Sequence, residues 1–510
     1  MSDLGDLGDA VRARIERLEA DHVPARIWER DHTVWRPDPV EISDRLGWLT
    51  VHREMAGRTE ELRAFARRCA ADGMRWAVLC GMGGSSLAPE VFRESFGAGL
   101  LDLIVLDTTH PDQIISVEEA IDLRRTLFVI SSKSGTTIET RAQLEHLWER
   151  VPDGTRFVAI TDPGTELGEL ASERGFRRTF ENPPDIGGRY SALSYFGLVP
   201  AALVGADLDA LLEGAARSAA ACGPEVPAEE NPAVVLGAWM GEAARLGRDK
   251  LTMAFHGRVA SLGAWVEQLV AESTGKDGTG VVPVEGEPLG PPSMYGSDRL
   301  FVTGEDGASD AIVGWLGRSG HPIVRSSVRE PAELGGAMFV WELATAIAGH
   351  VLDVHPFDQP DVQAAKDATA RALGSGARSE VDPGDLTEVA GAVAPGDYVA
   401  LQAFVPRGEP TTSRLQAVRR AIRDGRKVAT TLGFGPRFLH STGQLHKGGP
   451  DSAVCIQVVD EPRGDLDVPG RDFTFARLLA AQAAGDLEAL RDRGRRVARV
   501  RPDELEGFAW

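Results

Sequence analysis

The sequence predicts an α/β protein with doubly wound parallel sheets, and three observations support this fold class. In the first half of the chain, short apolar runs recur at intervals of roughly 25 residues, with helix-compatible stretches between them. The same texture restarts after residue 231, and two further apolar runs lie near the C-terminus. Short continuous apolar runs that alternate with helices are typical of parallel strands buried on both faces.

Helices are expected first, over residues 11–30 and 45–70, which are rich in Arg and Glu and have an amphipathic pattern. The strands expected in the first sheet are residues 76–80, 103–107, 126–130 and 157–161. We assign the N-terminal helices and this first sheet to a domain of residues 1–205.

A second domain is expected over residues 206–375. A stretch rich in Gly, Pro and Glu, residues 223–232, predicts a boundary near its start. A strand is then expected at 251–255 and a helix at 262–272, and a long apolar helix follows at 337–354. These elements repeat the pattern of the first domain, so we expect a second doubly wound sheet.

The last part of the chain, residues 376–510, is expected to form a C-terminal α/β extension. Residues 374–396 are polar, acidic and rich in turn formers, and they have the composition of a linker. Strands are expected at 398–404 and 453–458, and an amphipathic helix near 475–493.

The composition limits the class of partner. A chain of 510 residues suits two or three domains, and 43% hydrophobic with 26% charged residues is ordinary for a globular protein. The formal net charge is −21, and such an acidic surface repels nucleic acid and anionic lipid. We therefore expect neither as a partner, and an anionic substrate would need a local positive pocket.

The sequence also bears on compartment and metal content. The cysteines are Cys69, Cys80, Cys222 and Cys455, without Cys-x-x-Cys spacing, so we expect reduced core thiols and a cytosolic protein. Residues 1–10 are acidic and Gly-rich, unlike a signal peptide, and the apolar runs are too short to span a membrane. Because His, Cys and Asp residues do not cluster at ligand spacing, we expect no metal.

The first chemical signal is the loop Gly81-Met-Gly-Gly-Ser-Ser86, between an expected strand and an expected helix. Glycines let a backbone approach an anion, and a helix N-terminus supplies free N–H groups. A dinucleotide site is one alternative, with Asp107 as the ribose-binding acid, but its fingerprint needs a third glycine where Ser86 stands. A tight turn without a ligand is the other.

The second signal is Ser131-Ser-Lys-Ser-Gly-Thr-Thr-Ile-Glu-Thr140, after the third expected strand. Hydroxyls and backbone N–H groups can surround a phosphate, and Lys133 can add charge. Helix capping is the alternative, but one or two hydroxyls would suffice for it. A dinucleotide site has no use for this loop, whereas a phosphosugar bound between two loops does. Glu139 is interpreted as lying in the following helix, outside this cradle.

Together these two loops resemble the sugar-isomerase domain, and further segments resemble the glucose-6-phosphate isomerase family. The segments are 187–198 around Arg189, 265–283 around Glu272, and 356–366 ending at Lys366. They follow the family's order, and the resemblance is closest to the isomerase half of bifunctional transaldolase/isomerase chains. It implies two sugar-isomerase domains, no cofactor, and interconversion of glucose 6-phosphate and fructose 6-phosphate through an enediol. No transaldolase portion is present, so that activity is not expected.

The resemblance also implies roles for individual residues. Glu272 matches the base that moves a proton between C2 and C1, and Arg189 matches the cation that stabilises the enediolate. Lys366 matches a lysine used in ring opening and Gln359 a substrate contact, and their seven-residue spacing suggests one helix face. A solvated glutamate, a structural ion pair and a surface lysine are the plain alternatives. The residues expected to bind phosphate are Ser132, Lys133, Ser134 and Thr137, and those expected to contact sugar hydroxyls are Gly84 and Ser85.

One departure from the family concerns the histidine of ring opening, which the family often takes from a partner subunit. Its usual motif is missing between residues 285 and 335, where His321 suits a structural role equally well. The segment 434–450 carries two histidines among glycines and cations, so His440 and His446 are both candidates. The resemblance further implies a homodimer.

Three rival functions remain open from the sequence alone. A non-catalytic phosphosugar-binding module would keep both loops and lose the base. A different phosphosugar isomerase, for example one that also accepts mannose 6-phosphate, would differ only in fine pocket contacts. A nicotinamide oxidoreductase would rest on the first loop alone and would bind its cofactor.

Overall fold

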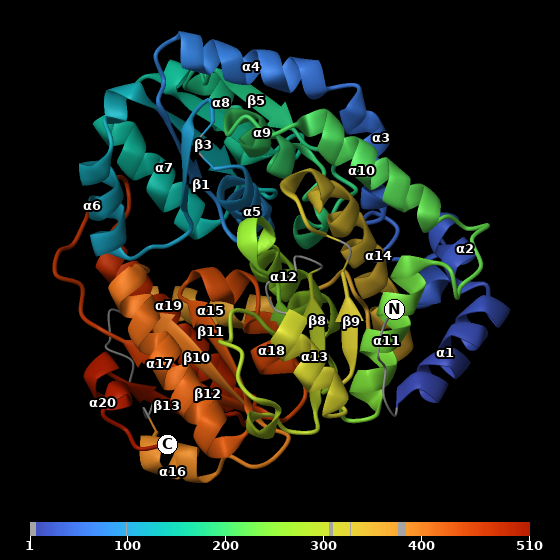
Figure 1. Cartoon of the computed structure of the whole chain (residues 1–510). Coiled ribbons are helices and arrows are strands. Elements are labelled where there is room, and N and C mark those ends of the chain that lie inside the picture. Colours follow the sequence, from blue (N-terminus) through green and yellow to red (C-terminus); the bar gives the residue numbers. More distant parts are fainter. Residues whose placement is uncertain (1–6, 98, 305–309, 327, 376–383) are drawn as a thin grey trace.

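The computed structural model describes residues 7–97, 99–304, 310–326, 328–375 and 384–510. Three separate sheets, each entirely parallel, follow one another along the chain, and helices pack around them (Figure 1). This confirms the predicted α/β fold class. The sheets lie within residues 1–205, 206–375 and 376–510 in turn, and these domain boundaries stay our prediction.

The first sheet has the strand order β2-β1-β3-β4-β5. Its strands are β1 (Trp76–Cys80), β2 (Asp102–Leu106), β3 (Thr126–Ser131), β4 (Phe157–Thr161) and β5 (Arg178–Glu181). The connecting helices are α5 (Leu87–Phe96), α6 (Pro111–Ala120), α7 (Ile138–Arg150) and α8 (Glu166–Glu173). The chain reverses its direction of winding between β1 and β3, and ligands bind outside the carboxyl ends of strands at such a point. The two predicted loops follow these two strands.

The second sheet has the order β7-β6-β8-β9. Its strands are β6 (Lys250–Ala254), β7 (Val282–Val284), β8 (Arg299–Thr303) and β9 (Ile323–Arg325), with helices α12 (Leu262–Thr274) and α13 (Asp310–Arg318). The helices around it include α10 (Leu208–Ala221), α11 (Pro232–Arg245) and α14 (Leu334–Leu352), whereas α9 (Tyr195–Leu203) packs against α5 beside the first sheet. By length and composition, residues 331–352 could cross a membrane, but 83% of their most apolar window is buried inside the protein.

The third sheet is also doubly wound, with the order β11-β10-β12-β13. Its strands are β10 (Tyr398–Phe404), β11 (Ala429–Phe434), β12 (Ala453–Val459) and β13 (Arg496–Val500). The helices of this part are α16 (Leu386–Gly391), α17 (Glu409–Arg426), α18 (Gly443–Gly448), α19 (Phe475–Asp492) and α20 (Pro502–Glu506). Of the predicted linker, residues 376–383 lie outside the described residues.

The N-terminal helices are α1 (Gly8–Ala20), α2 (Val23–Trp28), α3 (Val51–Ala56) and α4 (Thr59–Ala71). Each long helix predicted here is therefore split. Between α1 and α2, His22 adopts a left-handed conformation with φ of 54°, which a continuing helix does not allow. Residues 1–6, part of the segment predicted not to be a signal peptide, lie outside the described residues.

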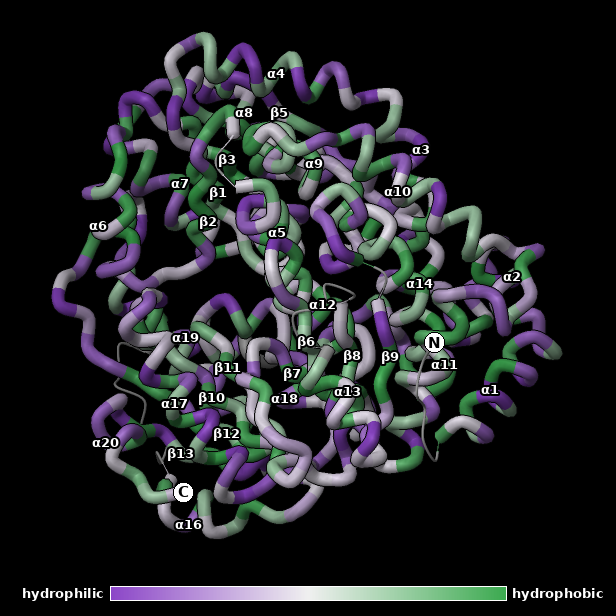
Figure 2. Tube along the Cα trace, viewed as in Figure 1, coloured by the Kyte–Doolittle hydropathy of each residue, from purple (hydrophilic) through white to green (hydrophobic). Residues whose placement is uncertain are grey.

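The C-terminal sheet is joined to the rest of the molecule through α15 (Pro360–Ser375) and α19, which pack against each other. Phe475 and Leu478 of α19 also lie in one apolar cluster with Leu144 and Leu147 of α7. Hydrophilic residues recur along outer helices such as α4 and α17, and hydrophobic residues follow the inner strands (Figure 2). All four cysteines are free and buried, in agreement with the predicted core thiols.

Candidate active site

Arg189 lies at the centre of the site and is buried, on a short 3₁₀ turn (Gly188–Tyr190). Its Nε donates to Ser273 Oγ at 2.8 Å, and its Nη1 donates to Gln359 Oε1 at 2.8 Å. Its Nη2 donates to the carbonyls of Pro356 and Asp358 at 2.7 and 2.9 Å. These bonds fix the guanidinium in one orientation and bring the predicted arginine and glutamine together.

Glu272 lies in the last turn of α12, next to Arg189, and is 7% exposed. Its Oε2 is 3.7 Å from Arg189 Nη1 and accepts a hydrogen bond of 3.1 Å from Gln268 Nε2. Since α12 places residues 268 and 272 one turn apart, Gln268 orients the carboxylate from its own helix. A buried carboxylate beside a fixed cation is the pair that an enediol mechanism needs.

The glycines of the first loop let three segments meet at this point. A Cβ at position 84 would lie 2.0 Å from the carbonyl oxygen of Gly188. At Gly83, where φ is +55°, a Cβ would lie 2.5 Å from the carbonyl oxygen of His440 and 2.8 Å from Gln268 Nε2. Ser85 is buried, and its carbonyl accepts from Ser131 Oγ at 3.3 Å. The loop therefore packs against both the Arg189 turn and the segment that carries His440.

The second loop forms the turn that the sequence predicts between β3 and α7. Ser132 Oγ is 3.0 Å from Thr137 Oγ1 and accepts from the backbone N–H of Gly135 at 3.2 Å. Ser134 Oγ is 3.0 Å from Thr136 Oγ1, and both residues are exposed. The turn is thus held internally, with hydroxyls at its outer edge available to a ligand.

Lys133 points to the neighbouring strand end rather than into open solvent. Its Nζ forms an ion pair with Asp162 and donates to the carbonyl of Pro184 at 3.0 Å. Burial raises the pKa of Asp162, and the nearby Lys133 only partly offsets this. A phosphate bound at this loop would therefore compete with Asp162 for the ammonium group of Lys133.

A cavity of about 500 Å³ lies beside the second loop. The residues that line it include Ser134, Thr136 and Thr137 of the loop, Glu139 of α7, Lys366 and Thr369 of α15, His440, and Gln482 of α19. Lys366 is exposed at this cavity. Gln359 lies just before α15 begins, so it is not on one helix face with Lys366; it is turned toward Arg189 instead.

His440 is held in this cavity by Glu139, a residue that the sequence prediction placed outside the cradle. His440 Nε2 is 2.8 Å from Glu139 Oε1, and Gln482 Nε2 donates to the same oxygen at 2.7 Å. Thr109 in turn donates to Gln482 Oε1 at 2.7 Å. Burial opposes ionisation of Glu139, but His440 outweighs it and lowers the pKa of this carboxyl.

The two candidate histidines have different environments. His446 is buried against β10, with its Nδ1 3.0 Å from Tyr398 Oη, and it does not line the cavity. Burial lowers the pKa of His446 to about 3, so this imidazole stays neutral. His321 packs edge-on against Phe301 and Tyr295, in an apolar cluster of the second sheet. Of the three histidines considered, His440 is the one that lines the cavity with Lys366 and the second loop.

The fold and these loops define a class of protein, the phosphosugar isomerases. A solved glucose-6-phosphate isomerase from Chlamydia trachomatis superposes with a TM-score of 0.54 at 22% identity, covering 70% of this chain and 78% of that one. A solved hypothetical protein from Thermus thermophilus gives a TM-score of 0.61 at 25% identity, covering 73% of this chain and 100% of that one.

Sequence comparison narrows this class of protein to one family. Residues 41–284 match the phosphoglucose isomerase family model. A glucose-6-phosphate isomerase of Citrifermentans bemidjiense is 31% identical over 385 residues, covering 64% of this chain and 72% of the relative. A glucose-6-phosphate isomerase of Thermus thermophilus is 30% identical over 396 residues, covering 65% of this chain and 91% of the relative. The chain belongs to the phosphoglucose isomerase family.

Proposed function

We propose that this chain interconverts glucose 6-phosphate and fructose 6-phosphate through an enediol, with Glu272 as the base. The observation that carries the proposal is the buried pair of Glu272 and Arg189, whose side chains approach to 3.7 Å. Both belong to segments that resemble the family's catalytic motifs. The names of the relatives support the same reaction.

In this mechanism Glu272 takes the proton from C2 of the open-chain sugar and returns it to C1. The intermediate carries negative charge on oxygen, and the fixed guanidinium of Arg189 stabilises it. Gln268 keeps the carboxylate aimed at the substrate, and Gln359 is placed to contact a sugar hydroxyl beside Arg189. Gly84 and Ser85 bring the first loop against the same hydroxyls.

The second loop binds the phosphate in this proposal. Ser132, Ser134 and Thr137 supply hydroxyls, together with backbone N–H groups near the start of α7. Lys133 supplies the charge by exchanging its contact with Asp162 for one with the phosphate. This local positive site offsets the acidic surface of the chain, which would otherwise repel an anion.

Ring opening is assigned to His440 and Lys366, which line one cavity with the second loop. The imidazole removes the proton of the anomeric hydroxyl and delivers one to the ring oxygen as the C–O bond breaks, so protons balance. Glu139 orients the ring through its contact with Nε2. Lys366 stabilises charge on the sugar oxygens. His446 has no role in this scheme. We further propose a cytosolic homodimer that needs no cofactor.

The test is a coupled assay with fructose 6-phosphate on wild type, Glu272→Gln and Glu267→Gln. Loss of the base should reduce turnover by about a thousandfold, within the usual range for acid–base catalysis. Glu267→Gln is the matched control, because Glu267 lies on the same helix but lines a different cavity. If wild type binds the sugar phosphate and gives no turnover, the enzyme proposal fails in favour of a binding module.

A further inference from the structure

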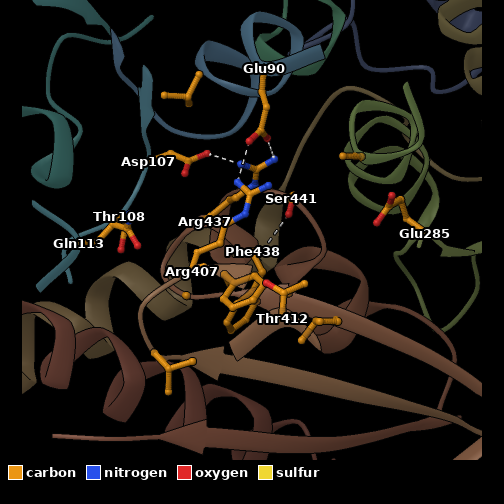
Figure 3. A pocket seen from close by; sticks show the side chains of 18 of the residues that line it. Glu90, Asp107, Thr108, Gln113, Glu285, Arg407, Thr412, Arg437, Phe438 and Ser441 are labelled. Carbon is orange, nitrogen blue, oxygen red and sulfur yellow. Dashed lines mark hydrogen bonds and ion pairs between the residues drawn. The ribbon is translucent and has the colours of Figure 1, made fainter. Parts of the chain in front are cut away.

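The short segment that carries His440 separates two cavities. Leu439 and His440 line the cavity beside the second loop, whereas Arg437, Phe438 and Ser441 line a larger cavity of about 530 Å³ on the other side. Figure 3 shows this second cavity, between the first sheet and the C-terminal sheet. Arg437 and His440 are the first and last residues of one 3₁₀ turn (Arg437–His440). Contacts that hold Arg437 in place therefore also restrict the position of His440.

Arg437 reaches from the C-terminal sheet into the first domain. Its Nη1 is 2.8 Å from Asp107 Oδ2, which follows β2, and its Nη2 contacts Glu90 of α5 (Figure 3). The side chains of Glu90 and Asp107 are each only 7% exposed, and that of Arg437 is 12% exposed. Arg407 also approaches Glu90, at 2.7 Å, but its side chain is 46% exposed.

The charges of Glu90, Asp107 and Arg437 favour one position of the turn. Burial would raise the pKa of Glu90, but Arg437 and Arg407 outweigh it and lower that pKa to about 2. Burial raises the pKa of Asp107 despite Arg437. The guanidinium between these two buried carboxyl groups offsets the cost of burying them, so the ion pairs favour the observed position of the turn.

A second contact holds the other end of the turn. The carbonyl of His440 accepts a hydrogen bond of 2.8 Å from Gln268 Nε2, which also bonds Glu272. The backbone at His440 is therefore linked to the helix of the candidate base, and its side chain to Glu139. Displacement of Arg437 would loosen the turn between these points.

We propose that Arg437 is a positioning residue for ring opening, and that its ion pairs with Glu90 and Asp107 hold His440 against Glu139 of the same chain. The inference rests on the proposed function. It differs from a purely structural role, because only steps that use His440 should suffer. Proton transfer between C2 and C1 by Glu272 does not require the imidazole.

Ring opening can be measured alone in the Glu272→Gln background, which lacks the base. Exchange between the two anomers of glucose 6-phosphate, followed by NMR, needs ring opening and closure but no transfer from carbon. Adding Arg437→Gln should slow the catalysed exchange by about 10- to 100-fold, the scale expected for a misplaced catalytic group. Binding of glucose 6-phosphate should stay within about threefold, since the residues that line the cavity of Arg437 do not include those of the second loop.

Three further variants separate a positioning role from a loss of stability. Arg437→Lys retains charge without the fork that spans two carboxylates, so it should restore exchange only in part. The triple change Arg437→Gln, Glu90→Gln and Asp107→Asn leaves no buried charge unpaired, and it should fold and still exchange slowly. Arg407→Gln is the matched control, because Arg407 also pairs with Glu90 but does not belong to the turn; it should leave exchange within about twofold.

The outcomes distinguish a failure of the proposed ring-opening function from a failure of the positioning role of Arg437. If Glu272→Gln alone catalyses no anomer exchange, the proposed ring-opening function fails, whatever Arg437 does. If it catalyses exchange, and Arg437→Gln and the folded triple variant exchange equally fast, the positioning role is overturned. Equal losses in substrate binding and exchange would show a general structural defect, which also contradicts it.

Discussion

The imidazole Nε2 of His440 lies 2.8 Å from Glu139 Oε1, although 301 residues separate the two in the sequence. One residue belongs to the segment after β11 of the third sheet, and the other to the first turn of α7 beside the first sheet. His440 lies outside the matched family region, residues 41–284, and lines one cavity with Glu139, which lies inside that region.

Replacement of His440 should affect turnover far more than substrate binding. His440→Ala should lower kcat by about a hundredfold, the lower end of what a general acid–base group contributes. Glu139→Gln should lower kcat by about tenfold, because the ring remains but loses its charged partner. Both are measured as kcat and KM in the coupled assay. An unchanged kcat in His440→Ala would remove this residue from the mechanism.

His446 should instead affect stability and its pH dependence. Its folded pKa of about 3 lies below the ordinary 6.5, so the unfolded state takes up the proton first. The contribution of His446 to the free energy of unfolding is then fully present above pH 6.5. It is lost as the pH drops toward 3, by up to about 1.4 kcal/mol per pH unit. His446→Leu should flatten this dependence in urea unfolding at several pH values, while kcat stays within about threefold. Parallel curves for both proteins would contradict the prediction.

The two proposed catalytic residues, Glu272 and His440, should act within one chain. If so, co-expressed Glu272→Gln and His440→Ala chains cannot restore each other, because each variant lacks one essential group of its own site. Sites shared between subunits would instead recover about a quarter of the wild-type activity, since half of randomly paired dimers are mixed and half of their sites are intact. The measurement is specific activity of the co-purified mixture, with each variant alone as the control.

The contact between Lys133 and Asp162 predicts opposite effects of two substitutions. Lys133→Met should raise KM for fructose 6-phosphate by about 10- to 100-fold, the usual contribution of one hydrogen bond to a charged group. Asp162→Asn removes the competing carboxylate, so KM should fall or stay within about threefold. The measurement is KM from initial rates at low and high salt for both variants. Salt screens charge, so the difference in KM between wild type and Lys133→Met should be smaller at high salt.

Two neighbouring glycines offer a paired steric test. Gly84→Ala would place a methyl group 2.0 Å from the carbonyl oxygen of Gly188 and displace the turn of Arg189. We expect kcat to fall by about a hundredfold, since small displacements of a catalytic group have such effects. Gly188→Ala is the control, because a Cβ there meets nothing within 4 Å. Equal activity of both variants would show that the loop can move without consequence.

The elements that could be predicted from sequence are those with a strong apolar run. The strands expected at 76–80, 126–130 and 157–161 all form, because they are central or fully buried. Strands β5, β9 and β11 lie at sheet edges, and β5 and β11 are rich in polar residues. Such edges depend on pairing with a neighbour rather than on their own pattern, so local reasoning does not find them.

The site was predictable where motifs are local, and not where partners are distant. Arg189, Glu272 and Gln359 could be chosen from their segments, and the structure brings them together. The burial of Glu139 could not be read from its helix, because its partner arrives from the C-terminal sheet. The choice between His440 and His446 likewise needed the fold, since both share one glycine-rich segment.

The third sheet has a consequence for the activity of the enzyme at low protein concentration. An enzyme whose active site includes a histidine from a partner subunit loses activity when its subunits dissociate, so its specific activity falls on dilution. Here Glu139, Gln482 and His440 meet within one polypeptide. Because the chain supplies this histidine itself, we expect the contribution of His440 to activity not to depend on dilution.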